Sequence, residues 1–211
     1  MKWRKLLSGL CVGIVLLIFM SPSLWAGEPG KLIMDTMDRG LAILKEPSLF
    51  EDQGEKPSAE EKAKERRQRL WEEISPMFDF EETSKRTLGR YWQERSLSEK
   101  REFVKLFTNI LKDTYVGKAD SGERVVYLGE KQEDNYATVQ TRFITRTGAE
   151  ISVDFRLLNN QGKWKVYDAI IEGVSLVNNY RSQFNSILAR SSYAGLVQKI
   201  KGKSRDEIST K

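Results

Sequence analysis

The spacing of apolar residues changes once from that of helices to that of strands, and then back. Up to Tyr115 apolar residues recur every three or four positions, as in amphipathic helices. From about Gly117 to Ser175 apolar and polar residues alternate, as in strands with one buried face. After Leu176 the helical spacing returns. This order predicts an α+β fold in which N-terminal and C-terminal helices pack on one face of an antiparallel sheet.

Helix-start signals divide the first part of the chain. A serine or aspartate followed three residues later by a glutamate is the capping-box pattern, and it occurs as Ser58 with Glu61, Asp79 with Glu82 and Ser96 with Glu99. Gly89 stands where a glycine ends a helix. We therefore expect helices over 31–45, 58–74, 79–89 and 96–115, with a polar loop over 50–57.

The alternating part of the chain predicts a four-stranded antiparallel meander. We expect strands over 124–128, 136–146, 150–158 and 164–175, with a hairpin turn at 159–162. The fourth strand is apolar on both sides. Trp164, Val166 and Ile170 are assigned to one face, and Tyr167, Ala169 and Ile171 to the other. Helices over 176–189 and 193–201 are expected to follow.

Apolar side chains are most concentrated on one face of the predicted sheet and on the helix 96–115. The sheet face carries Val139, Phe143, Val153, Phe155, Val166 and Ile170, and the opposing helix stripe carries Phe103, Leu106, Phe107 and Ile110. Two interpretations stay open. The two faces fill each other as an ordinary core, or a curved sheet under long helices leaves an apolar cleft for a ligand.

The residue content removes most common catalytic sites. The 211 residues include no histidine and one cysteine, Cys11. Histidine-based nucleophilic dyads, zinc sites with His or Cys ligands and internal disulfides are therefore excluded. Asp154, Asp168 and Glu172 remain as carboxylates on strands, and for Asp154 we expect cross-strand ion pairing with arginine rather than acid–base catalysis. We expect no enzyme, metal or cofactor.

The first 26 residues have the layout of a secretory signal peptide. Basic residues precede an apolar run over 6–20, which is shorter than the ~20 residues of a spanning helix. We expect cleavage after Ala26, with Ser23 as the second choice. An uncleaved anchor and lipidation at Cys11 are alternatives, although the residue before Cys11 is not small.

Removal of this segment would lower the net charge of the chain. The formal net charge is +5, and the segment carries three basic and no acidic residues, which leaves +2. The charge therefore gives no reason to expect a nucleic-acid partner. We expect an exported protein with one domain over 27–203 and a polar tail over 204–211.

Two stretches resemble the landmarks of the MlaC family. The segment WKVYDAIIEGVSLVNNYRSQFNSIL at 164–188 resembles the family signature, and the segment FDFEETSKRTLGRYWQERSLSEKREFVKLFTNILKDTY at 78–115 resembles a second landmark. The matching positions of the signature are Trp164, Tyr167, Asp168, Glu172, Gly173, Ser175, Leu176, Tyr180, Arg181 and Phe184. The charged stretch 51–69 departs from the best-known members, in which it is shorter.

The resemblance implies a phospholipid carrier of the periplasm. Such a protein shuttles lipids between an outer-membrane lipoprotein-type complex and an inner-membrane ABC-type complex, docking on each transiently. Its cargo's acyl chains lie in a cleft between sheet and helices, with the head group near solvent. The resemblance also adds Tyr167, Tyr180 and Phe184 to the candidate lipid contacts. The two tyrosines have structural packing or gating of the pocket mouth as alternative roles.

Three other functions stay open. The first is a carrier of another apolar molecule, such as a hopanoid or other polycyclic lipid. The second is an exported enzyme on a similar scaffold that uses Asp154, Asp168 or Glu172. The third is an interaction protein in which the apolar faces are only core.

Overall fold

The structure is a computed structural model that describes residues 27–46, 58–116 and 122–202. The predicted signal peptide, the predicted loop over 50–57 and the predicted tail lie outside these residues. The elements are α1 (Glu28–Lys45), α2 (Ala59–Ile74), a 3₁₀ turn η2 (Ser75–Met77), α3 (Phe80–Leu88), α4 (Arg90–Gln93), α5 (Leu97–Tyr115), β1 (Gly122–Glu133), β2 (Tyr136–Thr145), β3 (Glu150–Asn160), β4 (Lys163–Ile171), β5 (Val174–Ser175), α6 (Leu176–Leu188) and α7 (Tyr193–Gly202).

The strands form one antiparallel sheet in chain order, β1-β2-β3-β4-β5, which confirms the predicted meander. The hairpin turn expected at 159–162 is present, with Gln161 and Gly162 at φ 53° and 80°. The prediction of one continuous fourth strand to residue 175 was wrong. Glu172 and Gly173 also have positive φ, 49° and 79°, so the chain turns there and β5 pairs back on β4.

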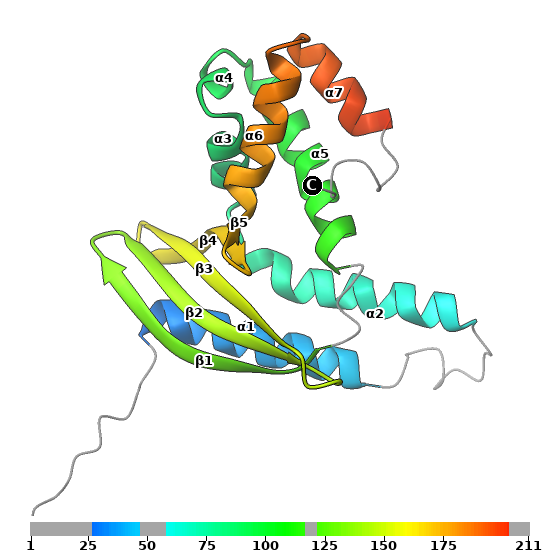
Figure 1. Cartoon of the computed structure of the whole chain (residues 1–211), viewed down its shortest axis with the longest axis vertical. Helices are drawn as coiled ribbons and strands as arrows, with labels where there is room; N and C mark the ends of the chain where they lie inside the picture. The colour runs from blue at the N-terminus through cyan, green and yellow to red at the C-terminus, as the bar shows by residue number, and fades with distance from the viewer. Residues whose placement is uncertain (1–26, 47–57, 117–121, 203–211) are drawn as a thin grey trace, which may run out of the picture.

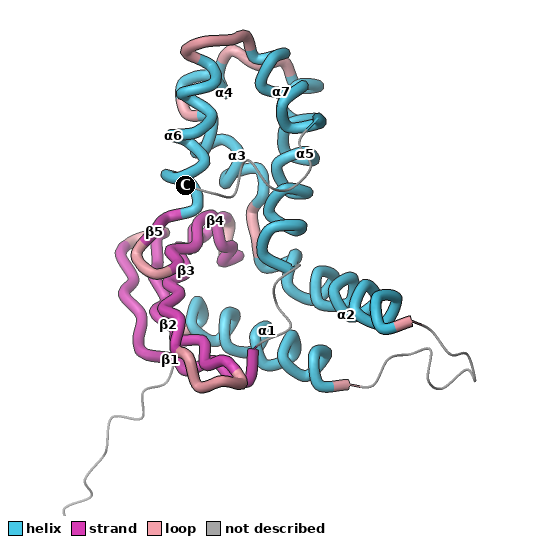
Figure 2. Tube along the Cα trace, turned by 45° about the vertical axis from the view of Figure 1, so that its right-hand side comes forward, coloured by secondary structure: helices cyan, strands magenta, loops and turns pink. Residues whose placement is uncertain are grey.

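The helices divide between two parts of the molecule. Figure 1 shows α3, α4, α5, α6 and α7 together above the sheet, while α1 runs along the sheet. In Figure 2, turned by 45°, α1 lies against one face of the sheet and α2 extends beside it. We call α3 to α7 the helical bundle and the sheet with α1 and α2 the sheet layer.

Capping side chains set the helix boundaries as the sequence predicted. Ser58 and Ser96 each form a complete capping box with the glutamate three residues later. The Asp79 carboxylate accepts a hydrogen bond of 2.8 Å from the amide of Glu82 at the start of α3. Gly89 ends that helix at φ 58°, a conformation that glycine adopts without strain.

The sheet and the helix 96–115 do not share one core: the described residues form three clusters, one under the sheet, one in the bundle and a small one of Leu44, Leu70 and Val116. The sheet layer buries Ile33 and Met37 of α1 against the sheet, including Val139 and Val166. The bundle core instead holds the stripe of α5: Phe103 and Phe107 are buried, and Leu106 and Ile110 pack partly buried against it. An amphipathic stripe shows that a helix face is buried, but not which element covers it. Here other helices cover α5, and α1 covers the sheet.

Strand β4 carries the polar contacts that fix the bundle on the sheet. Asp168, 4% exposed, accepts hydrogen bonds from the amide of Val177 (3.0 Å) and the hydroxyl of Ser175 (2.7 Å), which cap α6. The Thr83 hydroxyl of α3 donates to the Tyr167 carbonyl at 2.9 Å. The elements are thereby held at the point where the chain passes from β5 into α6.

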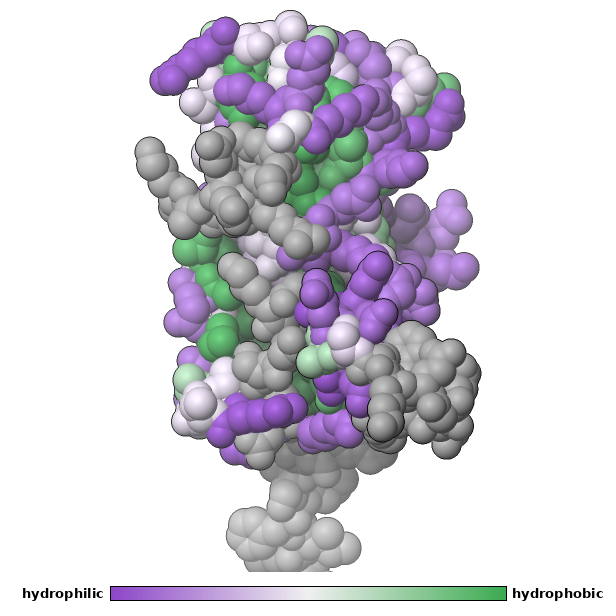
Figure 3. All heavy atoms as spheres, turned by 90° about the vertical axis from the view of Figure 1, so that its right-hand side faces the viewer, coloured by the Kyte–Doolittle hydropathy of each residue, from purple (hydrophilic) through white to green (hydrophobic). Residues whose placement is uncertain are grey.

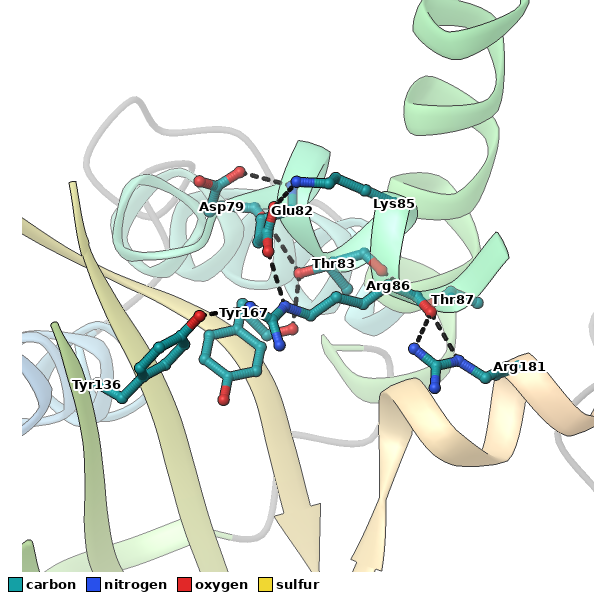
Figure 4. A network of polar contacts seen from close by, with 9 residues as sticks. All are labelled: Asp79, Glu82, Thr83, Lys85, Arg86, Thr87, Tyr136, Tyr167 and Arg181. Carbon is teal, nitrogen blue, oxygen red and sulfur yellow. Dashed lines mark hydrogen bonds and ion pairs between the residues drawn. The ribbon is translucent and has the colours of Figure 1, made fainter. Parts of the chain in front are cut away.

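A second set of contacts, drawn in Figure 4, also joins α3 and α6 to the sheet; we call this region the junction. The Arg86 guanidinium lies 4.1 Å from the centre of the Tyr167 ring and donates to Glu82 at 2.8 Å. Arg181 of α6 donates to the Arg86 carbonyl at 2.7 Å, so α3, α6 and the sheet are linked in one network.

Candidate functional site

An apolar cavity of about 340 Å³ lies inside the sheet layer where it meets the end of α5. It is partly open to solvent, and its volume lies within the ~300–1,000 Å³ of small-molecule sites. The helices contribute Met37, Gly40, Leu41 and Leu44 of α1, Leu70, Trp71 and Ile74 of α2, Met77, Phe78 and Phe80, Leu111, Tyr115 and Val116, and Leu176. The sheet contributes Phe143, Ile144, Thr145, Ile151, Val153, Phe155, Ala169 and Ile171.

The close approach of α1 and α2 forms one wall. A Cβ atom on Gly40 would lie only 3.0 Å from Cδ1 of Leu70, so the absence of a side chain at residue 40 lets the two helices meet. One turn to either side of Gly40 on α1, Met37 and Leu44 line the same space.

The facing wall is the sheet, and part of it was predicted correctly. Phe143, Val153 and Phe155, placed on the apolar face by their alternation, all line the cavity. Val139 and Val166 share the sheet core and are fully buried, but they are not among the lining residues.

The prediction that Ile170 shares this face was wrong. Opposite β3, Phe155 pairs with Ala169 and Val153 with Ile171, whereas Ile170 pairs with Asp154 on the other face. The register shifts between Leu157–Val166 and Arg156–Asp168, so Tyr167 is an extra residue in β4. Such a β-bulge reverses the alternation beyond it. Ala169 and Ile171 therefore line the cavity in place of Ile170.

The remaining predicted residues lie away from the cavity. Phe103, Leu106, Phe107, Ile110, Tyr180 and Phe184 belong to the bundle core. The Tyr180 ring meets Phe107 at 5.0 Å and 75°, an edge-to-face contact. Tyr167 contacts Arg86 and Tyr136 between α3 and the sheet and is not among the residues that line the cavity.

The sequence interpretation missed the contribution of α1 and α2. The signal for α1 was present, because Met37, Leu41 and Leu44 form its apolar stripe. In α2 the stripe of Leu70, Trp71 and Ile74 is thin and surrounded by charged residues, which is typical of a solvated helix. Only the tertiary structure shows that it faces the same cavity as the sheet.

Among the described residues, the cavity lining includes no charged side chain and few polar groups. The Tyr115 hydroxyl is hydrogen-bonded to Tyr180, and burial raises the pKa of Tyr115 well above its ordinary value. This phenol therefore stays neutral at physiological pH. Such a lining favours hydrocarbon.

Charged residues lie around the cavity. Lys112 of α5 donates to Gln68 of α2 at 2.7 Å, and Arg69 pairs with Glu46, the residue that follows α1. Figure 3, which views the molecule from the right-hand side of Figure 1, shows hydrophilic side chains over much of that face, with apolar ones between them in its upper part.

The carboxylates considered for catalysis have other positions. Asp168 caps α6 and pairs with Arg156 at 3.3 Å, and Glu172 accepts a hydrogen bond from the amide of Ser152. Asp154 lies opposite Gln140 and Ile170, on the face away from the cavity. Residues 27–46, 58–116 and 122–202 contain no cluster of three or more His, Cys, Asp or Glu suited to a metal ion. Within the same ranges, we find no helix whose length and hydropathy suffice for a membrane span.

Comparisons with known proteins agree with this architecture. A family model described as "MlaC protein" matches residues 48–202. A Haemophilus influenzae protein named "Intermembrane phospholipid transport system binding protein MlaC" is 25% identical over 135 residues, which cover 61% of this chain. The match spans 63% of that relative, less than two thirds of its length.

A solved structure has the same fold. The phospholipid-binding protein from Ralstonia solanacearum, in complex with a phospholipid, superposes with a TM-score of 0.70 at 24% identity. The superposition covers 83% of this chain and 96% of that protein.

Proposed function

This chain belongs to the MlaC family, and from that membership we propose that it is a non-enzymatic phospholipid carrier of the periplasm. The observation that supports the proposal most strongly is the apolar cavity of about 340 Å³ between α1, α2, the end of α5 and the sheet, whose described lining residues carry no charge. A homologue of the same fold was solved with a phospholipid bound.

The apolar lining of the cavity meets one requirement of lipid transfer, the shielding of hydrocarbon from water. Each methylene exposed to water costs about 0.8 kcal/mol, so acyl chains cannot cross an aqueous compartment unshielded. About 30 methylenes in two chains correspond to about 25 kcal/mol relative to water, which is more than any reversible affinity shows. A membrane offers the chains a similar environment, so a wall as apolar as a bilayer makes exchange with a membrane nearly balanced.

The large burial energy of the acyl chains also indicates that loading and release of the lipid need partner proteins. Direct escape of the cargo into water would be too slow for a shuttle, because most of the burial energy would be lost. We therefore propose transient docking to an outer-membrane lipoprotein-type complex and to an inner-membrane ABC-type complex, each of which offers the chains an apolar path. The phospholipid is cargo and not a cofactor.

Native mass spectrometry tests the proposal. The full chain is expressed, and the product is purified from the periplasmic fraction without detergent. We expect adducts with the masses of diacyl phospholipids that disappear on denaturation. Adducts of polycyclic mass would replace phospholipid by a hopanoid-like cargo. An apo mass with no uptake from liposomes would contradict the carrier function.

A variant locates the site. Phe143 is half-buried and lines the cavity, so Phe143→Glu places a charge against bound hydrocarbon. We expect the lipid-bound fraction to fall at least about tenfold, since an unpaired charge is costly in an apolar site. Leu97→Glu is the control, because Leu97 is 72% exposed at the start of α5. A folded Phe143→Glu protein that keeps its lipid would show that this cavity is not the binding site.

A further inference from the structure

We propose that Arg66 of α2 binds the phosphate group of the lipid cargo at the mouth of the cavity. The inference rests on the proposed function and names a residue that selects anionic diacyl lipids over uncharged ones. Arg66 lies beside the cavity lining, and its buried Nε atom has no partner among the described residues.

Two neighbours on α2 fix this position. Leu70, four residues later on the same helix face, lines the cavity. Arg69, three residues later, pairs with Glu46, which directly follows α1. Side chains of a helix lean toward its N-terminus, so the Arg66 side chain leads away from Leu70 toward the beginning of α2. A head group whose acyl chains filled the cavity would emerge at this place.

The bonding state of Arg66 differs from that of the charged residues around it. Arg39 pairs with Glu73 at 2.6 Å, Arg69 with Glu46 and Glu65, and Lys112 with Gln68. Arg66 is half-buried, its Nε is shielded from solvent, and that atom has no hydrogen-bond partner in the part of the chain that the structure describes. A buried donor without an acceptor is unfavourable, so the site favours an incoming anion.

The sequence of α2 leaves Arg66 without a carboxylate at helical spacing. Residues three and four positions away on either side are its neighbours on the helix surface. They are Lys62, Ala63, Arg69 and Leu70, of which two are cationic and none is acidic. Arg66 therefore has no acidic neighbour at helical spacing, and it adjoins a wall whose described residues are largely apolar, where a charge-assisted hydrogen bond is strongest.

The guanidinium group suits a phosphodiester. Its planar set of N–H donors matches two phosphate oxygens, and it remains charged at every physiological pH. A hydrogen bond between charged groups corresponds to a preference of about tenfold or more over a lipid without phosphate.

Two short-chain lipids that differ only in the head group test this role. Dioctanoyl phosphatidylglycerol and dioctanoyl glycerol displace an uncharged apolar dye from the purified, delipidated protein. We expect the wild type to prefer the phosphatidylglycerol about tenfold or more, and Arg66→Gln to reduce that preference to within about twofold while its affinity for dioctanoyl glycerol stays unchanged. Arg66→Lys should keep part of the preference, because the charge remains.

Two variants control for charge and substitution. Lys64→Gln removes an exposed positive charge from the same helix, and Arg101→Gln makes the identical change at an exposed site on α5. Both should keep the wild-type preference. A loss of preference in Lys64→Gln would show a diffuse field and overturn the assignment to Arg66.

The other outcomes are distinct. Equal binding of both lipids by the wild type overturns the phosphate site and leaves the carrier function intact. Binding of neither lipid overturns the carrier function as well. Calorimetry with inorganic phosphate at millimolar concentration should give no heat. Saturable binding of phosphate that is lost in Arg66→Gln, with no preference between the lipids, would identify a site for free phosphate instead.

Discussion

The bundle core and the cavity are built from similar apolar residues but packed differently. In the bundle, Phe107 meets Tyr180 at 5.0 Å, and Phe103 meets Phe184 at 5.8 Å and 83°, so the rings interlock. In the sheet layer, Phe143 and Phe155 face about 340 Å³ of open space. Apolar composition therefore does not distinguish a structural core from a binding site. The distinction depends on which elements close on one another.

The largest expected effect is a loss of stability in the bundle core. Phe103 is fully buried, so Phe103→Ala should lower the free energy of unfolding by about 3–5 kcal/mol. Urea denaturation measures this loss, and Leu97→Ala at an exposed site should change stability by less than about 0.5 kcal/mol. A loss below about 1 kcal/mol for Phe103→Ala would mean that the bundle is not closely packed.

The next effect concerns the junction between the two regions. Asp168→Asn keeps the shape of the side chain but removes the negative charge at the start of α6 and one acceptor for Val177, Ser175 and Arg156. We expect a loss of about 1.5–3 kcal/mol in the free energy of unfolding. Hydrogen exchange should show the largest loss of protection in α6. A uniform loss over the whole chain would contradict a local role.

A larger apolar side chain in the cavity should raise the free energy of unfolding, whereas the two changes above should lower it. Ala169 lines the cavity from β4, and Ala169→Leu adds apolar volume to open space. The unliganded protein should gain about 0.5–2 kcal/mol, while its affinity for diacyl lipid falls about tenfold or more. Denaturation and lipid titration of the same sample measure both. If stability falls and lipid binding is unchanged, the space at Ala169 is not the binding cavity.

The smallest effect is a pH dependence in the bundle. Burial raises the pKa of Tyr193 to about 12, above its ordinary value of 10.0, and its hydroxyl donates to the Glu99 carbonyl at 3.1 Å. A raised tyrosine pKa adds stability that is complete below pH 10 and lost as the pH rises toward 12. Tyr193→Phe should therefore flatten the decline of the urea midpoint in this range. Parallel declines in both proteins would contradict the assignment.

Local features of the fold were predictable because their causes are local. Capping pairs such as Ser96 with Glu99 act within one turn, and the turn at Gln161–Gly162 depends on two residues. The alternation of Phe143, Val153 and Phe155 also gave the correct sheet face, since strands alternate by geometry.

The wrong or missing predictions concern features that depend on contacts between segments far apart in the chain. The bulge at Tyr167 depends on how β4 meets β3, so alternation alone placed Ile170 on the cavity face and left out Ala169. The stripe of α5 gave no indication that α6 rather than the sheet would cover Phe107. Leu70 lines the cavity where it packs close to Gly40, thirty residues earlier in the chain. No local sequence pattern indicates this contact.

The strictly sequential meander has a consequence for how the chain folds as it emerges, N-terminal end first. Each strand pairs with its neighbour in the chain, so the sheet can form hairpin by hairpin with short loop closures. α1, however, is made first, and the strands that cover its apolar stripe begin only at Gly122. Until the meander emerges, Ile33 and Met37 remain exposed to water and to other chains. Aggregation of the nascent protein should therefore depend more on this first helix than on the sheet, and a chaperone that protects residues 28–45 would act where protection is needed for longest.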